Sequence, residues 1–193
     1  MSDRPSGAAI IETVTTTINP DGTVNCAAMG VQWGDDVIVI KPFPSTRTLR
    51  NLEATGAAVV NLTDDILLFT QAALGDPQPP TRPAATVDGA VLTDACSWRE
   101  VTVEAIDARG PRARVTTRVV DHGRGREFLG FNRACHAVLE ASIVASRARL
   151  LPTEEIRLEL ARLQVLVDKT AGPREREAME LVRRRVRAAV GGA

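Results

Sequence analysis

Two neighbouring segments of the sequence carry side chains that could together hold a mononucleotide. Residues 25–30 (NCAAMG) are mostly small, so a flat ring system could lie against them and hydrogen-bond to their backbone. Residues 45–48 (STRT) come at the expected start of a helix, where free backbone N–H groups and the helix dipole attract anions. The hydroxyls add donors and Arg47 adds positive charge. A ring platform beside a phosphate cradle is what a mononucleotide cofactor needs.

The helix start also has a simpler interpretation. Ser and Thr are favoured at helix N-termini because their side chains cap the first amides. Thr46 therefore serves either as a cap alone or as a cap that also lines an anion site. The residues themselves leave both interpretations open.

Other reactive side chains are few. The two histidines, His122 and His136, lack metal-ligand spacing, and the three cysteines, Cys26, Cys96 and Cys135, form no Cys-x-x-Cys pair. We therefore expect no metal site and three reduced thiols. No general base is evident, so the catalytic residues are unknown. His136 is either a proton donor or a structural residue of an Ala-rich helix.

Composition excludes several classes of function. The chain has 193 residues, a formal net charge of zero, no Tyr and few other aromatic residues. These features argue against a surface for the phosphate backbone of nucleic acid or for base stacking. Residues 1–7 are polar, no apolar signal region follows, and no stretch approaches the ~20 apolar residues of a membrane span. We expect a cytoplasmic protein with neither nucleic acid nor membrane as a partner.

The elements expected to position the two segments are mainly strands. Residues 8–18, 23–33 and 37–42 form an antiparallel meander, with a turn at 19–22 (NPDG). A helix follows residue 44 and ends at the capping Gly56. The remaining expected elements are a strand at 57–62, a helix after Thr63-Asp64-Asp65, an irregular Pro-rich loop at 75–83, and strands at 98–107 and 112–121.

From Asn132 onward the apolar spacing is helical. The apolar stripe of the first helix consists of Ala134, Ala137/Val138, Ala141 and Val144/Ala145. That of the second helix consists of Ile156, Leu160, Leu163 and Val167. That of the third helix consists of Ala178, Leu181/Val182 and Val186. Residues 183–185 (RRR) fit a solvated helix face. We expect a barrel domain at 1–131 and a helical region at 132–193.

The order of these segments resembles the flavin reductase-like FMN-binding split barrels, and most closely the domain-of-unknown-function 447 family. The most specific segments are PSTRTLRNLEATGAAVVNLTDD and FNRACHAVLEASIVASRARLL, supported by NCAAMGV and VDKTAGPREREAMELV. The resemblance implies a mainly β fold with α-helices (α+β). Its architecture would be an antiparallel split β-barrel whose C-terminal helical subdomain packs on the barrel or the dimer interface.

The resemblance also implies a homodimer with an FMN near each subunit interface. By matching position, the flavin ring or ribityl chain would face Asn25, Cys26, Ala27, Ala28, Met29 and Gly30. The phosphate would be surrounded by Lys41, Ser45, Thr46, Arg47 and Thr48, with Asn51 bracing their loop. Asn132, Arg133 and His136 are candidates to complete the site from the second subunit.

Two functions from different classes follow from this resemblance. The first is a flavin-dependent oxidoreductase whose FMN accepts hydride from NAD(P)H or another donor, with the cofactor carrying the chemistry. The alternative is a non-catalytic flavin- or pterin-binding protein linked to one-carbon metabolism, with a reduced pterin as partner.

Overall fold

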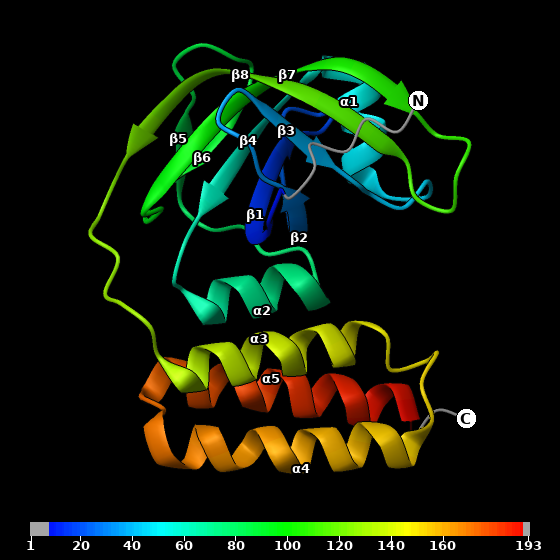
Figure 1. Ribbon diagram of the computed structural model, residues 1–193, viewed down its shortest axis with the longest axis vertical. Helices are drawn as coiled ribbons and strands as arrows, with labels where there is room; N and C mark the ends of the chain where they lie inside the picture. The colour runs from blue at the N-terminus through cyan, green and yellow to red at the C-terminus, as the bar shows by residue number, and fades with distance from the viewer. Residues whose placement is uncertain (1–7, 191–193) are drawn as a thin grey trace. The chain divides into compact units, whose positions relative to one another are not determined.

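The computed structural model describes residues 8–190, and these residues divide into two compact units (Figure 1). We call residues 8–63 and 78–127 the barrel unit. We call residues 64–77 and 128–190 the helical unit. Each unit is described separately below.

The barrel unit is a closed antiparallel barrel of six strands, in the order β1-β2-β3-β8-β7-β4. It confirms the mainly β fold with helices that we expected from the sequence. The strands are β1 (Ile10–Ile18), β2 (Val24–Gln32), β3 (Val37–Ile40), β4 (Ala57–Leu62), β7 (Ser97–Asp107) and β8 (Arg114–Arg124).

The turn between β1 and β2 forms where the sequence predicts it. Gly22 has φ of +82°, a backbone conformation that glycine adopts without a Cβ clash. The Asn19 N–H donates to the Thr23 carbonyl at 2.8 Å, and Asp21 Oδ1 accepts the Thr23 amide at 3.0 Å. This turn places Asn19 and Asp21 at the end of the barrel that also carries helix α1 (Arg47–Thr55).

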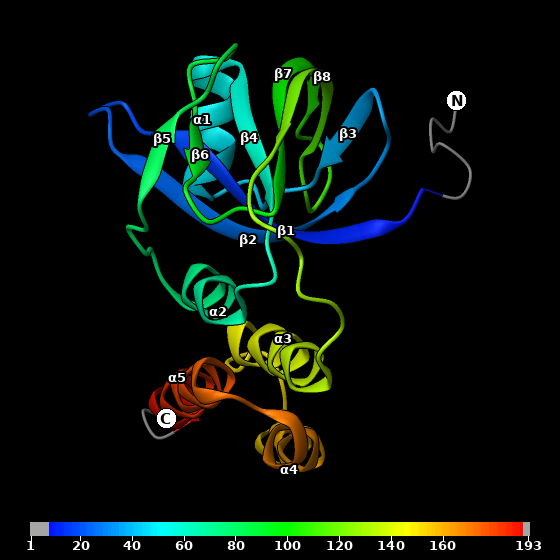
Figure 2. The ribbon, with the colours of Figure 1, turned by 90° about the vertical axis from the view of Figure 1, so that its left-hand side faces the viewer.

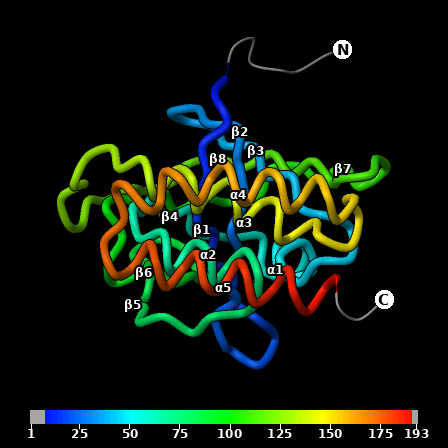
Figure 3. The backbone as a smooth tube through the Cα atoms, turned by 90° about the horizontal axis from the view of Figure 1, so that it is seen from below, coloured from blue at the N-terminus to red at the C-terminus, as the bar shows by residue number. Residues whose placement is uncertain are grey.

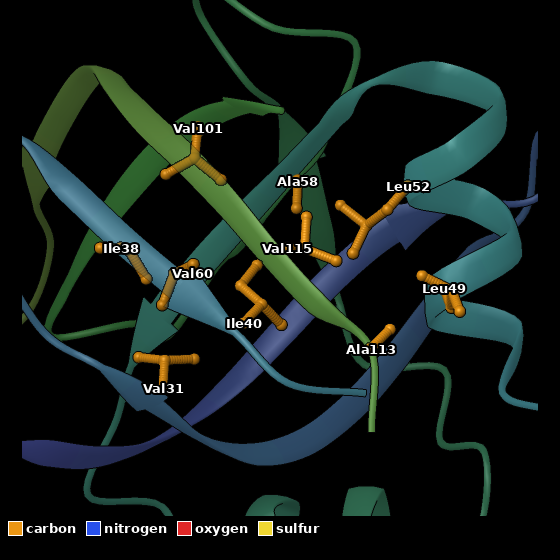
Figure 4. Packing of buried hydrophobic residues seen from close by; sticks show 10 residues of the cluster. All are labelled: Val31, Ile38, Ile40, Leu49, Leu52, Ala58, Val60, Val101, Ala113 and Val115. Carbon is orange, nitrogen blue, oxygen red and sulfur yellow. The ribbon is translucent and has the colours of Figure 1, made fainter. Parts of the chain in front are cut away.

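The barrel interior is filled by aliphatic side chains, as the low aromatic content requires. Leu49 and Leu52 of α1 point toward Ala58 and Val115 of the barrel strands (Figure 4). The other buried members of this cluster are Val31, Ile38, Ile40, Val60, Val101 and Ala113. Helix α1 therefore belongs to the core, and the expected cap at Gly56 is confirmed by its φ of +67° and its N–H donating to the Leu52 carbonyl.

The stretch 75–83, which we expected to be an irregular loop, ends in the first strand of a small hairpin. Its strands β5 (Thr81–Pro83) and β6 (Ala90–Leu92) pair antiparallel, and the sequence analysis missed both. Pro83 fits here because the hairpin is two-stranded and Pro is tolerated on an edge strand. The loop between the strands is held by Glu100, whose buried carboxylate accepts the amides of residues 85–87 at 2.9, 2.6 and 3.2 Å.

The helical unit contains four helices whose axes run roughly side by side (Figures 1 and 3). They are α2 (Ile66–Leu74), α3 (Arg133–Ser146), α4 (Thr153–Thr170) and α5 (Pro173–Val190). Helix α3 packs against the other three. The stripe expected for α3 is confirmed at Ala134, Ala137, Val138, Ala141 and Ala145, which are buried, whereas Val144 is partly exposed.

Residues 64–77 lie in the helical unit, whereas the sequence-based boundary assigned them to a domain at 1–131. The physical reason is that α2 packs on α3 and α5, and the buried hydroxyls of Thr70 and Ser142 hydrogen-bond at 2.9 Å. No helix within residues 8–190 is both long enough and apolar enough to cross a membrane.

Candidate functional site

The N-terminus of α1 combines a threonine cap with a first turn that carries no acidic residue. Thr46 is the N-cap: its Oγ1 accepts the Leu49 amide at 3.4 Å and donates to the Phe43 carbonyl at 2.7 Å. The first turn contains no acidic residue. The positive end of the helix dipole is therefore not neutralised by a side chain of the helix itself.

Arginines surround this helix end. Arg47 and Arg50 are exposed on α1, and Arg50 Nη1 donates to the Ser45 carbonyl at 3.1 Å. Arg112 comes from the loop before β8, and its guanidinium lies 4.2 Å from the centre of the Phe43 ring. Lys41 is half-buried, and its carbonyl accepts from Arg112 at 3.5 Å. The sequence therefore indicated Lys41 and Arg47 as cations of this site but did not indicate Arg50 and Arg112.

Asp21 is an acid whose carboxyl interacts with one of these cations, Arg47. The pKa of its carboxyl is lowered, first by hydrogen bonds from Thr23 and to a smaller extent by the charge of Arg47. The sequence showed Asp21 only as a turn residue. No sequence signal connects it with Arg47, which is brought close by the register of the β1–β2 hairpin.

Three of the predicted site residues are buried in one hydrogen-bond network beneath the helix end. Asn25, Thr48 and Asn51 are only 6, 3 and 2% exposed. The Asn25 side-chain amide donates to Thr17 Oγ1 at 3.1 Å and to Thr48 Oγ1 at 3.2 Å. The Asn51 amide donates to the same Thr17 hydroxyl at 3.0 Å. These side chains are therefore placed to fix α1 against β1 and β2.

The small-residue strand is β2, and most of one of its edges is unpaired. All nine residues of β2 pair with β1, but within the described chain its pairing with β3 is limited to Gln32 and Val39. Ala27, Ala28 and Met29 are partly exposed, whereas Cys26 is buried. The strand thus offers a narrow platform next to the end of α1.

Side chains of β1 lie close to Gly30. A Cβ at this position would lie 2.7 Å from Ile10 Cγ2 and 2.8 Å from Glu12 Oε1. The space beside Gly30 is therefore filled by side chains of β1.

The candidates from the helical unit are found around the start of α3. Asn132 caps the helix, with Oδ1 accepting the amides of Ala134 at 2.7 Å and Cys135 at 3.4 Å. Arg133 and His136 are exposed, and the His136 ring lies 5.8 Å from that of Phe131. Asn132 is thus occupied as a cap, and the other two remain available on the surface of this unit.

Cys135 has the properties of a structural thiol. Its Sγ donates to Glu175 Oε1 at 3.5 Å, and burial, together with the Glu175 charge, raises the pKa of the thiol to about 12. A thiol with such a pKa stays protonated and is a poor nucleophile. No group of three or more His, Cys, Asp or Glu residues suited to a metal ion occurs in the part of the chain that the structure describes.

A cavity of about 670 Å³ lies between α4 and α5 in the helical unit. Its walls are mainly the apolar side chains of Ile156, Leu160, Val186 and Val190. Arg157 and Arg183, at its rim, are already paired with Glu154 and Glu180. This cavity offers no redox or acid–base group.

Two family models match the chain. One, described as "Protein of unknown function (DUF447) N-terminal domain", matches residues 11–126. The other, described as "Protein of unknown function (DUF447)", matches residues 132–184. Together they take in the barrel strands and most of the helical unit.

Solved structures share the fold at low sequence identity. An FMN-bound protein from Methanosarcina mazei, assigned to the DUF447 family model, is 21% identical with a TM-score of 0.81, over 93% of this chain and 96% of that chain. An FMN-binding protein from Thermus thermophilus is 14% identical, with a TM-score of 0.53, over 68% and 85%. The flavin reductase of styrene monooxygenase from Pseudomonas putida S12 is 16% identical, with a TM-score of 0.51, over 61% and 80%. The fold is therefore that of the flavin reductase-like split barrels.

Proposed function

The chain belongs to the family described as "Protein of unknown function (DUF447)", and from this premise we propose that it binds FMN and acts as a flavin reductase-like oxidoreductase. The similar structure from Methanosarcina mazei is described as FMN-bound, and that from Thermus thermophilus as FMN-binding. The observation on this chain that carries the proposal is the acid-free N-terminus of α1 with arginines around it.

The phosphate of FMN fits this helix end. The amides in the first turn of a helix have no acceptor within the helix, and here Thr46 satisfies only that of Leu49. The remaining amides point at the site, and the exposed side chains of Ser45 and Arg47 lie beside them. Arg50 and Arg112 add charge against a dianion. Thr48 and Asn51 contribute by holding the helix in place from below.

The flavin ring fits the unpaired edge of β2. Ala27 and Ala28 carry only a methyl group each, so a planar ring can approach the backbone closely. The side chain of Met29 packs against the core of the barrel, so this residue offers its backbone to the ring. Backbone N–H and C=O groups at such an edge can bond to the polar rim of the ring.

When bound, FMN supplies the two-electron chemistry, and a reduced nicotinamide is the donor that we propose for it. The residues of this chain bind and orient the cofactor. Arg47, Ser45 and the α1 amides hold its charged end, and the buried network of Asn25, Thr17 and Asn51 keeps these groups at fixed positions. Preorganised donors of this kind cost no rearrangement when the ligand binds.

Two measurements test the proposal. Titration of the purified protein with FMN should quench flavin fluorescence and shift the flavin absorbance with a micromolar or lower dissociation constant. Absence of binding at this concentration contradicts the proposal. Addition of NADH or NADPH to the FMN-loaded protein without oxygen should then bleach the absorbance. If FMN binds but neither donor bleaches it, the proposal of FMN binding stands and the proposal of nicotinamide-dependent activity is rejected.

A further inference from the structure

The cavity between α4 and α5 exists because these two helices hardly pack on each other. Figure 2 looks along the helices and shows α3, α4 and α5 at the corners of a triangle. Helix α3 packs closely on both α4 and α5, whereas direct contacts between α4 and α5 are few. The first half of α4 and the second half of α5 therefore face each other across a space of about 670 Å³.

The inside of the cavity is aliphatic. Ile156 and Leu160 line it from α4, and Val186 and Val190 line it from α5. Each pair is four residues apart and so lies on one face of its helix, which gives the cavity the form of a slot along the helices. Ile156 is 1% exposed and lies at the bottom of the slot, whereas the other three side chains are partly exposed and form its walls.

The size of this slot is that of a ligand site. Packed protein interiors leave few voids larger than a water molecule. Pockets that hold small molecules have volumes of about 300–1,000 Å³ and mainly apolar walls. A flexible aliphatic chain fits such a slot because it can lie along both helices and remove their apolar side chains from water.

The rim of the slot is positively charged. Arg157, Arg183 and Arg187 are among its lining residues, and none of the lining residues within the described chain is acidic. Arg157 and Arg183 are paired with glutamates of their own helices. Arg187 is exposed and makes no ion pair within residues 8–190. Its guanidinium is therefore a cation beside an apolar slot, without a partner in the part of the chain that the structure describes.

The surrounding sequence adds to this charge. Residues 147–157, which lead into α4 and form its first turn, contain three arginines and two glutamates. Residues 180–187 of α5 contain four arginines and one glutamate. This end of the helical unit thus carries an excess of positive charge, which attracts anions.

We propose that the slot binds an aliphatic carboxylate, an unbranched fatty acid whose chain lies between α4 and α5 and whose carboxylate meets Arg187. The planar guanidinium matches a carboxylate with two parallel hydrogen bonds. A neutral chain would leave Arg187 unpaired, and a small anion would leave the slot unfilled, so the ligand needs both parts. None of the residues proposed to hold FMN lines this cavity, so the two proposals stand or fall separately.

Three simple ligands test the chemistry of the site. In calorimetric titration of the full chain, octanoate should bind at one site with a dissociation constant below about 1 mM. The uncharged 1-octanol should bind at least about tenfold more weakly, because it lacks the carboxylate. Acetate, which lacks the chain, should give no detectable binding. Absence of octanoate binding, or equal affinity for octanoate and 1-octanol, overturns the proposal.

Four variants test the position of the site. Arg187→Ala should raise the dissociation constant for octanoate roughly tenfold, whereas Arg184→Ala, an exposed arginine of α5 that does not line the cavity, should leave it unchanged. Leu160→Asp puts a carboxylate into the slot and should abolish binding. Leu158→Asp makes the same change at a leucine of α4 that is 57% exposed and lies outside the lining, and should not affect binding.

Circular dichroism shows whether each of these variants keeps its helices. If Leu160→Asp unfolds the helical unit, the two arginine variants still decide the matter, since both change exposed side chains. Equal octanoate affinity of Arg187→Ala and Arg184→Ala, or equal losses in folded Leu160→Asp and Leu158→Asp, would mean that the fatty acid binds elsewhere and would overturn the proposal.

Discussion

The Asn51 side chain donates a hydrogen bond of 3.0 Å to the hydroxyl of Thr17, which lies 34 residues earlier in the chain. The same hydroxyl accepts the Asn25 amide at 3.1 Å. A single threonine on β1 therefore connects the helix that carries the anion site to the strand that offers the ring platform. The relative position of these two parts of the candidate site depends on this connection.

Thr17→Val should reduce both stability and FMN affinity. The change keeps the shape of the side chain but removes one of the two acceptors of each of two side-chain amides, Asn25 and Asn51, which retain their bonds to Thr48 and Asn19. We expect the free energy of unfolding in urea to fall by about 1–3 kcal/mol. Thr116→Val is a matched control on β8, since its half-buried hydroxyl makes no hydrogen bond within the described residues. An equal loss in both variants would show that the Thr17 network has no special role.

Arg47→Ala should weaken FMN binding through the phosphate alone. We expect the dissociation constant for FMN to rise roughly tenfold, because one charge-assisted contact is lost. Binding of riboflavin, which lacks the phosphate, should be unchanged. Arg184→Ala removes an exposed arginine of α5 and should leave both affinities as they are. Parallel losses for FMN and riboflavin in Arg47→Ala would place the arginine near the ring instead.

Glu100→Gln should destabilise the barrel unit. The buried carboxylate accepts three backbone amides, and the substituted amide group would turn a donor toward at least one of them. We expect a loss of about 2–4 kcal/mol in urea unfolding. Glu104→Gln, at an exposed pair with Arg118, should change stability by less than about 0.5 kcal/mol. Similar losses would mean that the loop at 84–88 is not held by Glu100.

Cys135 should resist alkylation and give the stability a pH dependence in base. The pKa of the Cys135 thiol in the folded chain, about 12, lies above the ordinary thiol value of 9.0, so the folded chain retains a proton that the unfolded chain releases. The stabilising effect is complete below pH 9 and is lost as the pH rises toward 12. Urea unfolding of wild type and Cys135→Ser at several alkaline pH values should show a steeper fall for wild type. Rapid iodoacetamide labelling of folded Cys135 at pH 8 would contradict the raised pKa.

Much of the fold could be predicted because local signals agree with the final structure. The turn at 19–22, the Thr46 cap, the Gly56 cap and the Asn132 cap each depend on a residue and its near neighbours. The hairpin of β5 and β6 was missed because Thr81–Pro83 is short and contains a proline. Its position depends on Glu100, which is distant in sequence.

The candidate site was predicted less completely, for a related reason. Sequence spacing indicated which residues come at the start of α1, but not which of their side chains turn inward. Thr48 and Asn51 are buried because one face of α1 packs on the barrel. Arg112 and Asp21 reach the site only through strand pairing, which single-sequence patterns do not specify.

The most direct test of the anion site at α1 is a calorimetric comparison of FMN with riboflavin on the wild-type chain. The two ligands share the ring and the ribityl chain and differ only in the phosphate. We expect FMN to bind at least about 100-fold more tightly, since the phosphate meets helix amides and several arginines. Equal affinity for the two ligands would contradict a phosphate site at the N-terminus of α1.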